Sequence, residues 1–202
     1  MQLGSALGQA RLAQLLTIAW MIVEAVVAVG SGLAAHSLAL TAFGFDSLIE
    51  LFSSAVVLRR LMARSAEEER GTSTPGERTA SRLVGIALYL LIAYIVAAAI
   101  LGLFLHVRPQ SSPIGIGLVV VALVVMAVLW RWRLALADRL DSPALRGDAA
   151  CSVVCLYLAA ATLVGLTVNS LMGWWWADPI AGLALIFWIR GEAREAIAAG
   201  GG

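Results

Sequence analysis

The sequence predicts an all-α membrane protein, a polytopic bundle of six transmembrane helices with both termini in the cytoplasm. Apolar residues make up 61% of the 202 residues and charged residues only 13%, more apolar surface than one soluble core could bury. These apolar residues fall into six stretches of about twenty residues, the length that a helix needs to cross a bilayer. All the strongly basic residues are arginines, and they gather in alternate gaps between the stretches.

The order of the expected spans follows from these gaps. The first span is retained, because no small-residue cleavage site precedes its long apolar run. The arginine-rich gaps after the second and fourth spans, and the tail after the sixth, face the cytoplasm. The other gaps carry at most Arg108 and face outward. The polar segment 61–81 has no apolar face and is expected to form a flexible cytoplasmic loop. Asp178 followed by Pro179 indicates a helix start. We place the six spans near residues 12–32, 36–58, 82–105, 113–132, 144–170 and 174–190.

Acidic residues lie inside the spans, where each charge costs about 2.5 to 3.5 kcal/mol on insertion scales. Asp46 and Glu50 lie one helical turn apart on one face of the second span, and Glu24 lies in the first. No expected span holds an arginine in its interior, so the acids must be protonated or share a cation. The alternative for Asp46 and Glu50 is a pair of protonated acids bonded across helices. Glu24 either carries protons and supports the site or is a neutral hydrogen bonder between helices.

The fifth span begins with three residues that share one stripe. Asp148, Cys151 and Cys155 follow i, i+3, i+7 spacing. Counting inward along opposite helices at about 1.5 Å per residue puts Cys155 level with Asp46 and Cys151 level with Glu50. Asp148 falls about one turn nearer the cytoplasm. Carboxylates with a thiolate suit a borderline-soft ion such as zinc. The cysteines could equally be small core residues, and Asp148 could be a helix cap or dipole partner.

Two motifs resemble a known family. Residues 36–50 (HSLALTAFGFDSLIE) resemble the second transmembrane helix of cation diffusion facilitators, and residues 173–179 (GWWWADP) resemble the entry to their sixth helix. The resemblance implies six spans with both termini inside, so it covers essentially the whole chain. In that family two acids of helix 2 and a His-x-x-x-Asp pair of helix 5 form a tetrahedral metal site. Asp46 and Glu50 match the first pair, whereas the second pair falls near Cys151 and Cys155.

The resemblance implies a transporter and not an enzyme. We expect export of a zinc-like divalent cation in exchange for protons, with Zn²⁺ or a similar ion as the transported substrate, no organic cofactor and no nucleic-acid partner. The family's C-terminal cytoplasmic domain is not expected. The expected setting is a bacterial inner membrane, and a homodimer is left open. The alternative is a non-transporting membrane protein that senses metal or scaffolds a partner. The expected site comprises the metal ligands Asp46, Glu50, Asp148, Cys151 and Cys155, with Glu24 as a proton relay.

Overall fold

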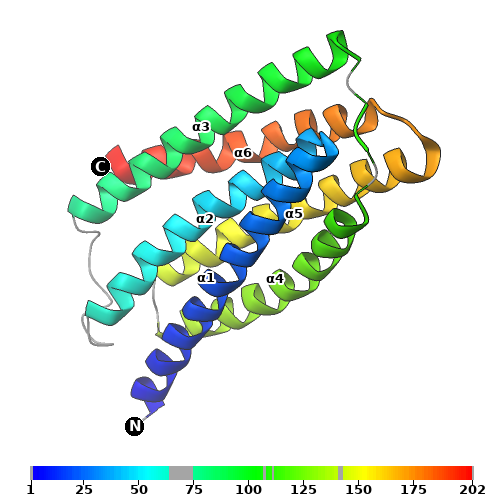
Figure 1. Cartoon of the computed structure of the whole chain (residues 1–202). Helices are drawn as coiled ribbons and strands as arrows, with labels where there is room; N and C mark the ends of the chain where they lie inside the picture. The colour runs from blue at the N-terminus through cyan, green and yellow to red at the C-terminus, as the bar shows by residue number, and fades with distance from the viewer. Residues whose placement is uncertain (1, 64–74, 107, 111, 141–142, 202) are drawn as a thin grey trace.

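Every described element of the chain is an α-helix. The computed structural model describes residues 2–63, 75–106, 108–110, 112–140 and 143–201. The helices lie side by side in an elongated bundle (Figure 1). This arrangement confirms the predicted fold class of a polytopic helical membrane bundle. The described residues form six helices, α1 (Gln2–Ala35), α2 (Leu38–Ala63), α3 (Pro75–Phe104), α4 (Pro113–Leu140), α5 (Pro143–Met172) and α6 (Ala177–Gly201).

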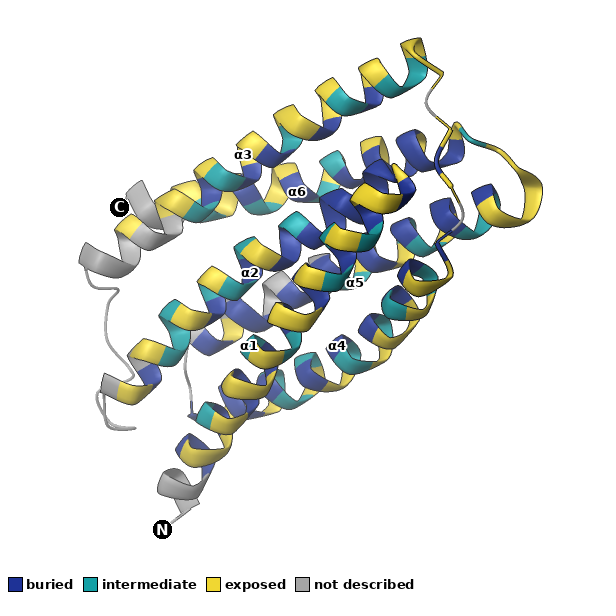
Figure 2. Cartoon of the chain, in the orientation of Figure 1, coloured by how far each residue is buried: buried dark blue, intermediate teal, exposed yellow. Residues whose placement is uncertain are grey.

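Five of the described helices are long and apolar enough to cross a membrane. Their large apolar side chains remain exposed on the outside of the bundle, where the exposed faces of the helices point away from one another (Figure 2). α6 is not among the five, because its second half carries four charged residues, although residues 179–189 are uncharged. The candidate spans are Ala6–Ala35, Leu38–Arg59, Arg82–Phe104, Pro113–Leu140 and Cys155–Met172.

Several helix ends differ from the expected boundaries, among them those of α4, α2 and α3. α4 continues to Leu140, eight residues beyond the expected end at 132. The expected loop 61–81 is helical at both ends, because residues 61–63 end α2 and residues 75–81 begin α3. Residues 64–74 lie outside the described residues.

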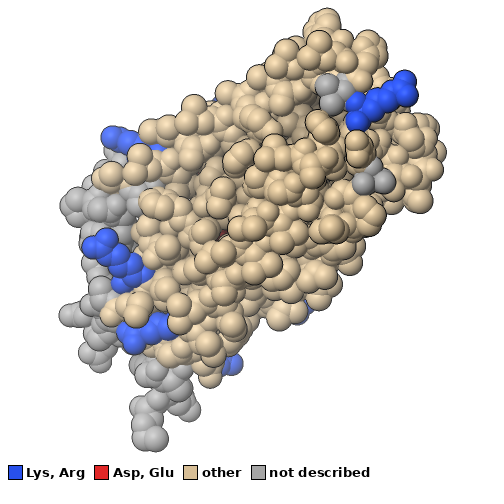
Figure 3. Space-filling model, in the orientation of Figure 1, with Lys and Arg blue, Asp and Glu red and all other residues tan. Residues whose placement is uncertain are grey.

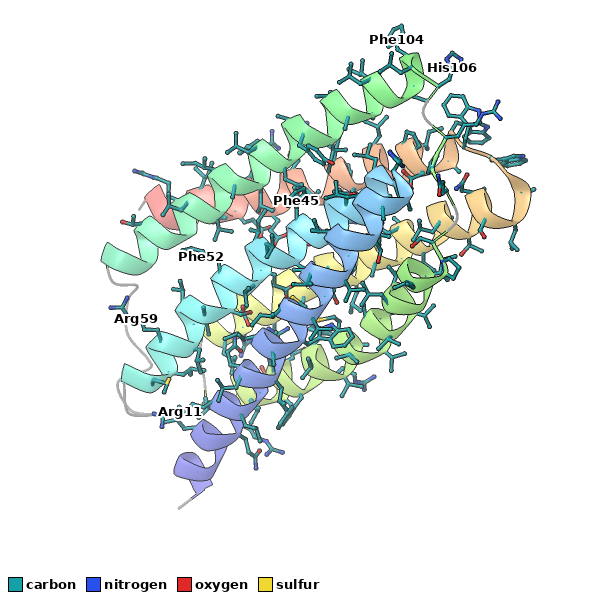
Figure 4. All side chains as sticks on the ribbon, viewed as in Figure 1. Arg11, Phe45, Phe52, Arg59, Phe104 and His106 are labelled. Atoms are coloured by element: carbon teal, nitrogen blue, oxygen red, sulfur yellow. The ribbon has the colours of Figure 1, made fainter. Side chains whose placement is uncertain are left out.

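The two ends of the bundle differ in charge. Both termini lie at one end, together with the last turns of α2 and α4 and the first turns of α3 and α5 (Figure 1). Arg11 and Arg59 lie toward this end, whereas Phe104 and His106 lie at the opposite end (Figure 4). On the face drawn in Figure 3, most of the visible arginine atoms gather near the termini and acidic side chains scarcely show. The acids of the expected spans are buried inside the bundle.

α2 occupies the centre of the packing. It packs most extensively on α1 and also contacts α3, α5 and α6, while α3 pairs with α6 and α4 with α5. Glycines allow the close approach of α1 and α2. A Cβ on Gly32 would lie 2.6 Å from the backbone nitrogen of Thr41, and one on Gly44 would lie 2.7 Å from that of Val29. These contacts bring the acid-bearing faces of α1 and α2 together.

An acid from α6 caps the start of α2. Asp178 Oδ2 accepts hydrogen bonds from the backbone nitrogens of Leu38 at 2.7 Å and Ala39 at 3.4 Å, and the Ser37 hydroxyl donates to Oδ1. Such bonds satisfy amides that have no partner in the first turn of a helix. Asp178 lies in the first turn of α6, as the sequence indicates, yet its side chain serves α2. The two helices are thereby joined at the end of the bundle opposite the termini.

Candidate functional site

Two carboxylates of α2 and one thiol of α5 meet inside the bundle. Asp46, Glu50 and Cys155 are all buried. Cys155 Sγ lies 3.0 Å from Asp46 Oδ2 and 2.6 Å from Glu50 Oε2, within hydrogen-bonding distance of both. The contact confirms the register predicted for Cys155 and Asp46 by counting along antiparallel helices.

These three groups are packed more closely than the ligands of a bound ion. With Zn–S about 2.3 Å and Zn–O about 2.1 Å, a sulfur and an oxygen on tetrahedral zinc lie about 3.6 Å apart. The Cys155 contacts are shorter than this by about 0.6 and 1.0 Å. Accordingly, the described part of the chain contains no group of three or more His, Cys, Asp or Glu side chains spaced to hold a metal ion. The thiol must move aside and lose its proton before all three groups can bind one ion.

A buried arginine faces the acids, which corrects the expectation that no span has an inward-facing arginine. Arg133 of α4 is 0% exposed and is the largest fully buried side chain among the described residues. Its Nη1 donates to Asp148 Oδ2 at 2.5 Å. Its Nη2 donates to Ser152 Oγ and lies 3.8 Å from Glu50 Oε1. The expectation fails because it ends the fourth span at residue 132 and leaves Arg133 outside the membrane.

The sequence does carry a signal for this arginine. A stripe of apolar residues at helical spacing continues on both sides of it, which places its side chain on the inner face of α4. A single arginine within such a stripe needs an acidic partner, and the acids of the neighbouring spans supply it. The buried residues of this stripe include Met126, Leu129, Arg133, Leu136 and Leu140.

Asp148 is bonded from three other helices. Besides the pairing with Arg133, Gln14 Nε2 donates to Asp148 Oδ2 at 2.8 Å and Ser54 Oγ donates to Oδ1 at 3.2 Å. These partners come from α4, α1 and α2, so the carboxylate of α5 joins four helices. The oxygens of Asp148 already accept three hydrogen bonds, so they are less available to bind an ion than the oxygens of Asp46.

Ser152 links the two acidic groups. Its hydroxyl donates to Glu50 Oε1 at 2.8 Å and accepts a hydrogen bond from Arg133. A continuous polar network therefore runs from Asp46 through Cys155 and Glu50 to Arg133. From Arg133 it continues to the carboxylate of Asp148. Prediction from the sequence missed Ser152, because a serine at helical spacing among apolar residues gives no distinct signal.

Glu24 lies beside this network on α1. It is completely buried. Ser47 Oγ donates to its Oε1 at 2.6 Å, and Trp20 Nε1 donates to its Oε2 at 2.7 Å. Ser47 directly follows Asp46 in α2, so Glu24 is next to the acid pair with both of its oxygens hydrogen-bonded. The side chain of the last predicted ligand, Cys151, lies outside the described residues, and its role stays a prediction.

A comparison with protein families now decides the identity of this bundle. The family described as the cation efflux transmembrane domain matches residues 13–199. The chain belongs to the cation efflux family. The match spans the polar network from Gln14 to Cys155 and confirms the resemblance inferred from the motifs in α2 and at the start of α6. No curated protein matches the chain.

Membership in the cation efflux family fixes the general activity. The family consists of cation transporters rather than enzymes, so the chain is an integral membrane protein that moves a metal cation. Charged and polar side chains inside such a bundle mark the path of ions or protons. In this cation efflux protein they are concentrated between α1, α2, α4 and α5.

Proposed function

We propose that this cation efflux protein exports a zinc-like divalent cation in exchange for protons, and that Asp46, Glu50 and Cys155 bind the ion. The supporting observation is the position of the Cys155 thiol against two carboxylates of another helix. Two carboxylates and a thiolate favour a borderline-soft ion, whereas Ca²⁺ and Mg²⁺ prefer shells made entirely of oxygen.

The balance of charge inside the bundle favours an exchange of the ion for protons. Among the described residues, four buried acids lie in or beside the polar network and only one buried guanidinium, that of Arg133, lies with them, which leaves a formal charge of −3 if every acid is ionised. Uncompensated ionised groups are very costly in a medium of low dielectric constant, so the site without an ion holds protons. An arriving divalent cation displaces them, because carboxylate and thiolate ligands bind metal in their deprotonated forms. The four acids are Glu24, Asp46, Glu50 and Asp148.

Asp148 has a different role in this proposal. Its three hydrogen bonds, one of which is the ion pair with Arg133, make it the partner of the arginine rather than a ligand of the ion. The ligands then come from α2 and α5 alone. A small relative movement of these two helices would open or close the site, since the thiol on α5 must separate from the carboxylates on α2.

The direction of transport is proposed from the distribution of arginine. The end that carries both termini is the arginine-rich end, and we place it in the cytoplasm of a bacterial cell, at the inner membrane. Each proton that enters the cell down the membrane potential releases about 2.3 kcal/mol of free energy per 100 mV. Proton entry can therefore drive the export of the ion.

Uptake of Zn²⁺ and Cd²⁺ into sealed proteoliposomes under an imposed pH gradient tests the proposal. Asp46→Asn should reduce gradient-driven uptake at least about 100-fold, because loss of a ligand should exceed the 10- to 100-fold cost of losing a group that only supports one. Asp138→Asn is the matched control, since Asp138 pairs with Arg146 at 2.9 Å and its side chain is 61% exposed. Wild-type uptake in Asp46→Asn would exclude the assigned site. Zinc binding without flux in the wild type would indicate a sensor or scaffold.

A further inference from the structure

The guanidinium of Arg133 is a positive charge fixed beside a proposed ligand of the ion. Its Nη2 lies 3.8 Å from Glu50 Oε1, close enough for an ion pair but too far for a hydrogen bond. The Ser152 hydroxyl bridges this distance, accepting from Arg133 and donating to Glu50. Arg133 Nε has no hydrogen-bond partner among the described residues. A movement of about 1 Å would bring the guanidinium into direct contact with Glu50.

The guanidinium lies closer to Asp148 than to Glu50. The distance from Arg133 Nη1 to Asp148 Oδ2 is 2.5 Å, whereas that from Nη2 to Glu50 Oε1 is 3.8 Å. Asp148 is itself fixed by Gln14 and Ser54, so the position of the guanidinium is set from three helices. The arginine is therefore shared unequally between two carboxylates, one that belongs to the ion site and one that does not.

We propose that Arg133 is a tethered cation that competes with the transported ion for Glu50, and that Asp148 sets the ion affinity by holding Arg133 back. This inference rests on the proposed function, because it takes Glu50 as a ligand. Arg133 pairs with Asp148 alone while the ion is bound, and it shares Glu50 when the ion leaves. A transport site must bind its ion strongly enough to admit it and weakly enough to release it. A resident positive charge beside one ligand serves that second requirement.

Two variants should shift zinc affinity in opposite directions. Asp148→Asn keeps a polar side chain for Gln14 and Ser54 but removes the charge that holds Arg133, which then pairs with Glu50. Its affinity for Zn²⁺ should fall at least tenfold. The double variant Arg133→Gln/Asp148→Asn removes both charges together, so no buried charge is left unpaired. Its affinity should return to the wild-type value or exceed it.

The alternative role of Asp148 predicts a different pattern. If Asp148 binds the ion directly, the loss in Asp148→Asn comes from a missing ligand, and replacing Arg133 as well cannot restore it. The double variant would then stay as weak as the single one. The two roles of Asp148 therefore predict different results for the double variant. Its Zn²⁺ affinity rises above that of the single variant if Asp148 holds Arg133 back, and does not rise if Asp148 is a ligand.

Titration of the detergent-purified full chain with Zn²⁺ by isothermal calorimetry decides between them. Arg11→Gln is the matched control, because Arg11 donates to the carbonyl of Leu61 at 2.9 Å and, among the described residues, has no hydrogen bond or ion pair to the four buried acids of the network; its affinity should stay within about twofold of the wild type. Recovery in the double variant supports the proposal. An unchanged affinity in Asp148→Asn, or a double variant as weak as the single, overturns it.

Two further measurements keep the outcome decisive. If Asp148→Asn does not fold, as judged by gel filtration, the double variant must still bind Zn²⁺ at least as tightly as the wild type, and weaker binding overturns the proposal. Glu50→Gln is titrated in parallel. Wild-type affinity in Glu50→Gln would refute the proposed function itself, whereas a loss there together with no recovery in the double variant would refute only the role of Arg133.

Discussion

Replacing Cys155 with serine removes the proposed soft ligand but keeps a polar group between the two carboxylates. The hydroxyl can still donate to Asp46 or Glu50, which lie 3.0 and 2.6 Å from the sulfur, so the variant should fold. To admit zinc the sulfur must separate from these oxygens by about 0.6 and 1.0 Å and become a thiolate. A serine hydroxyl does not ionise near neutral pH, so the occupied site would lose one negative charge and its proposed sulfur ligand. Cd²⁺ affinity should fall at least about 100-fold, and Zn²⁺ affinity less, about tenfold.

Calorimetric titration of the purified variant with Cd²⁺ and with Zn²⁺ measures both values and their ratio. Cys151→Ser, one turn earlier in α5, is the matched comparison and should leave the preference for Cd²⁺ nearly unchanged. A Cys155→Ser protein that binds Cd²⁺ like the wild type would refute the thiolate ligand. A selective loss in Cys151→Ser instead would move the sulfur ligand to the other cysteine.

Two further predictions concern α1 and its contact with α2. Gly44→Ala should lower the free energy of unfolding by about 1 to 3 kcal/mol, because its Cβ would lie 2.7 Å from the backbone nitrogen of Val29 and force α1 away. Gly30→Ala is the control, because a Cβ there would meet nothing within 4 Å, and this variant should be at least as stable as the wild type. If Gly44→Ala and Gly30→Ala unfold at the same temperature, the close contact of Gly44 with Val29 is contradicted. Glu24→Gln should bind Zn²⁺ normally but lose most of the uptake driven by a pH gradient, and full uptake would exclude a role in proton transfer.

The helices and one part of the site could be predicted because they depend on local regularities. Apolar stretches fix where helices cross the bilayer, and the alternation of arginine indicates which gaps share a side. A fixed rise per residue along two antiparallel helices was then enough to place Cys155 against Asp46, as found. The same counting places Asp148 about one turn nearer the cytoplasm, and the structure shows Ser54, one turn beyond Glu50, donating to its carboxylate.

The rest depends on contacts that no local pattern encodes. The pattern predicts Arg133 in the cytoplasmic gap after the fourth span, because an arginine ends an apolar stretch, whereas an acid on the next helix makes its burial acceptable. Gln14 is neutral and lies in the first turns of an apolar helix, so nothing in the sequence directs it toward Asp148. The capping of α2 by Asp178 joins residues 140 positions apart and follows only from the packing of the bundle.

That cap also restricts how α2, which carries the proposed ligands Asp46 and Glu50, can move. Because Asp178 holds the backbone of Leu38 and Ala39, α2 cannot slide along its axis without breaking both bonds. It can tilt about its fixed N-terminal end, or it can move together with α6 as one body. Asp46 and Glu50 lie two to three turns from the start of α2 at Leu38. A small tilt of α2 about that end therefore displaces both carboxylates in the same direction relative to α5.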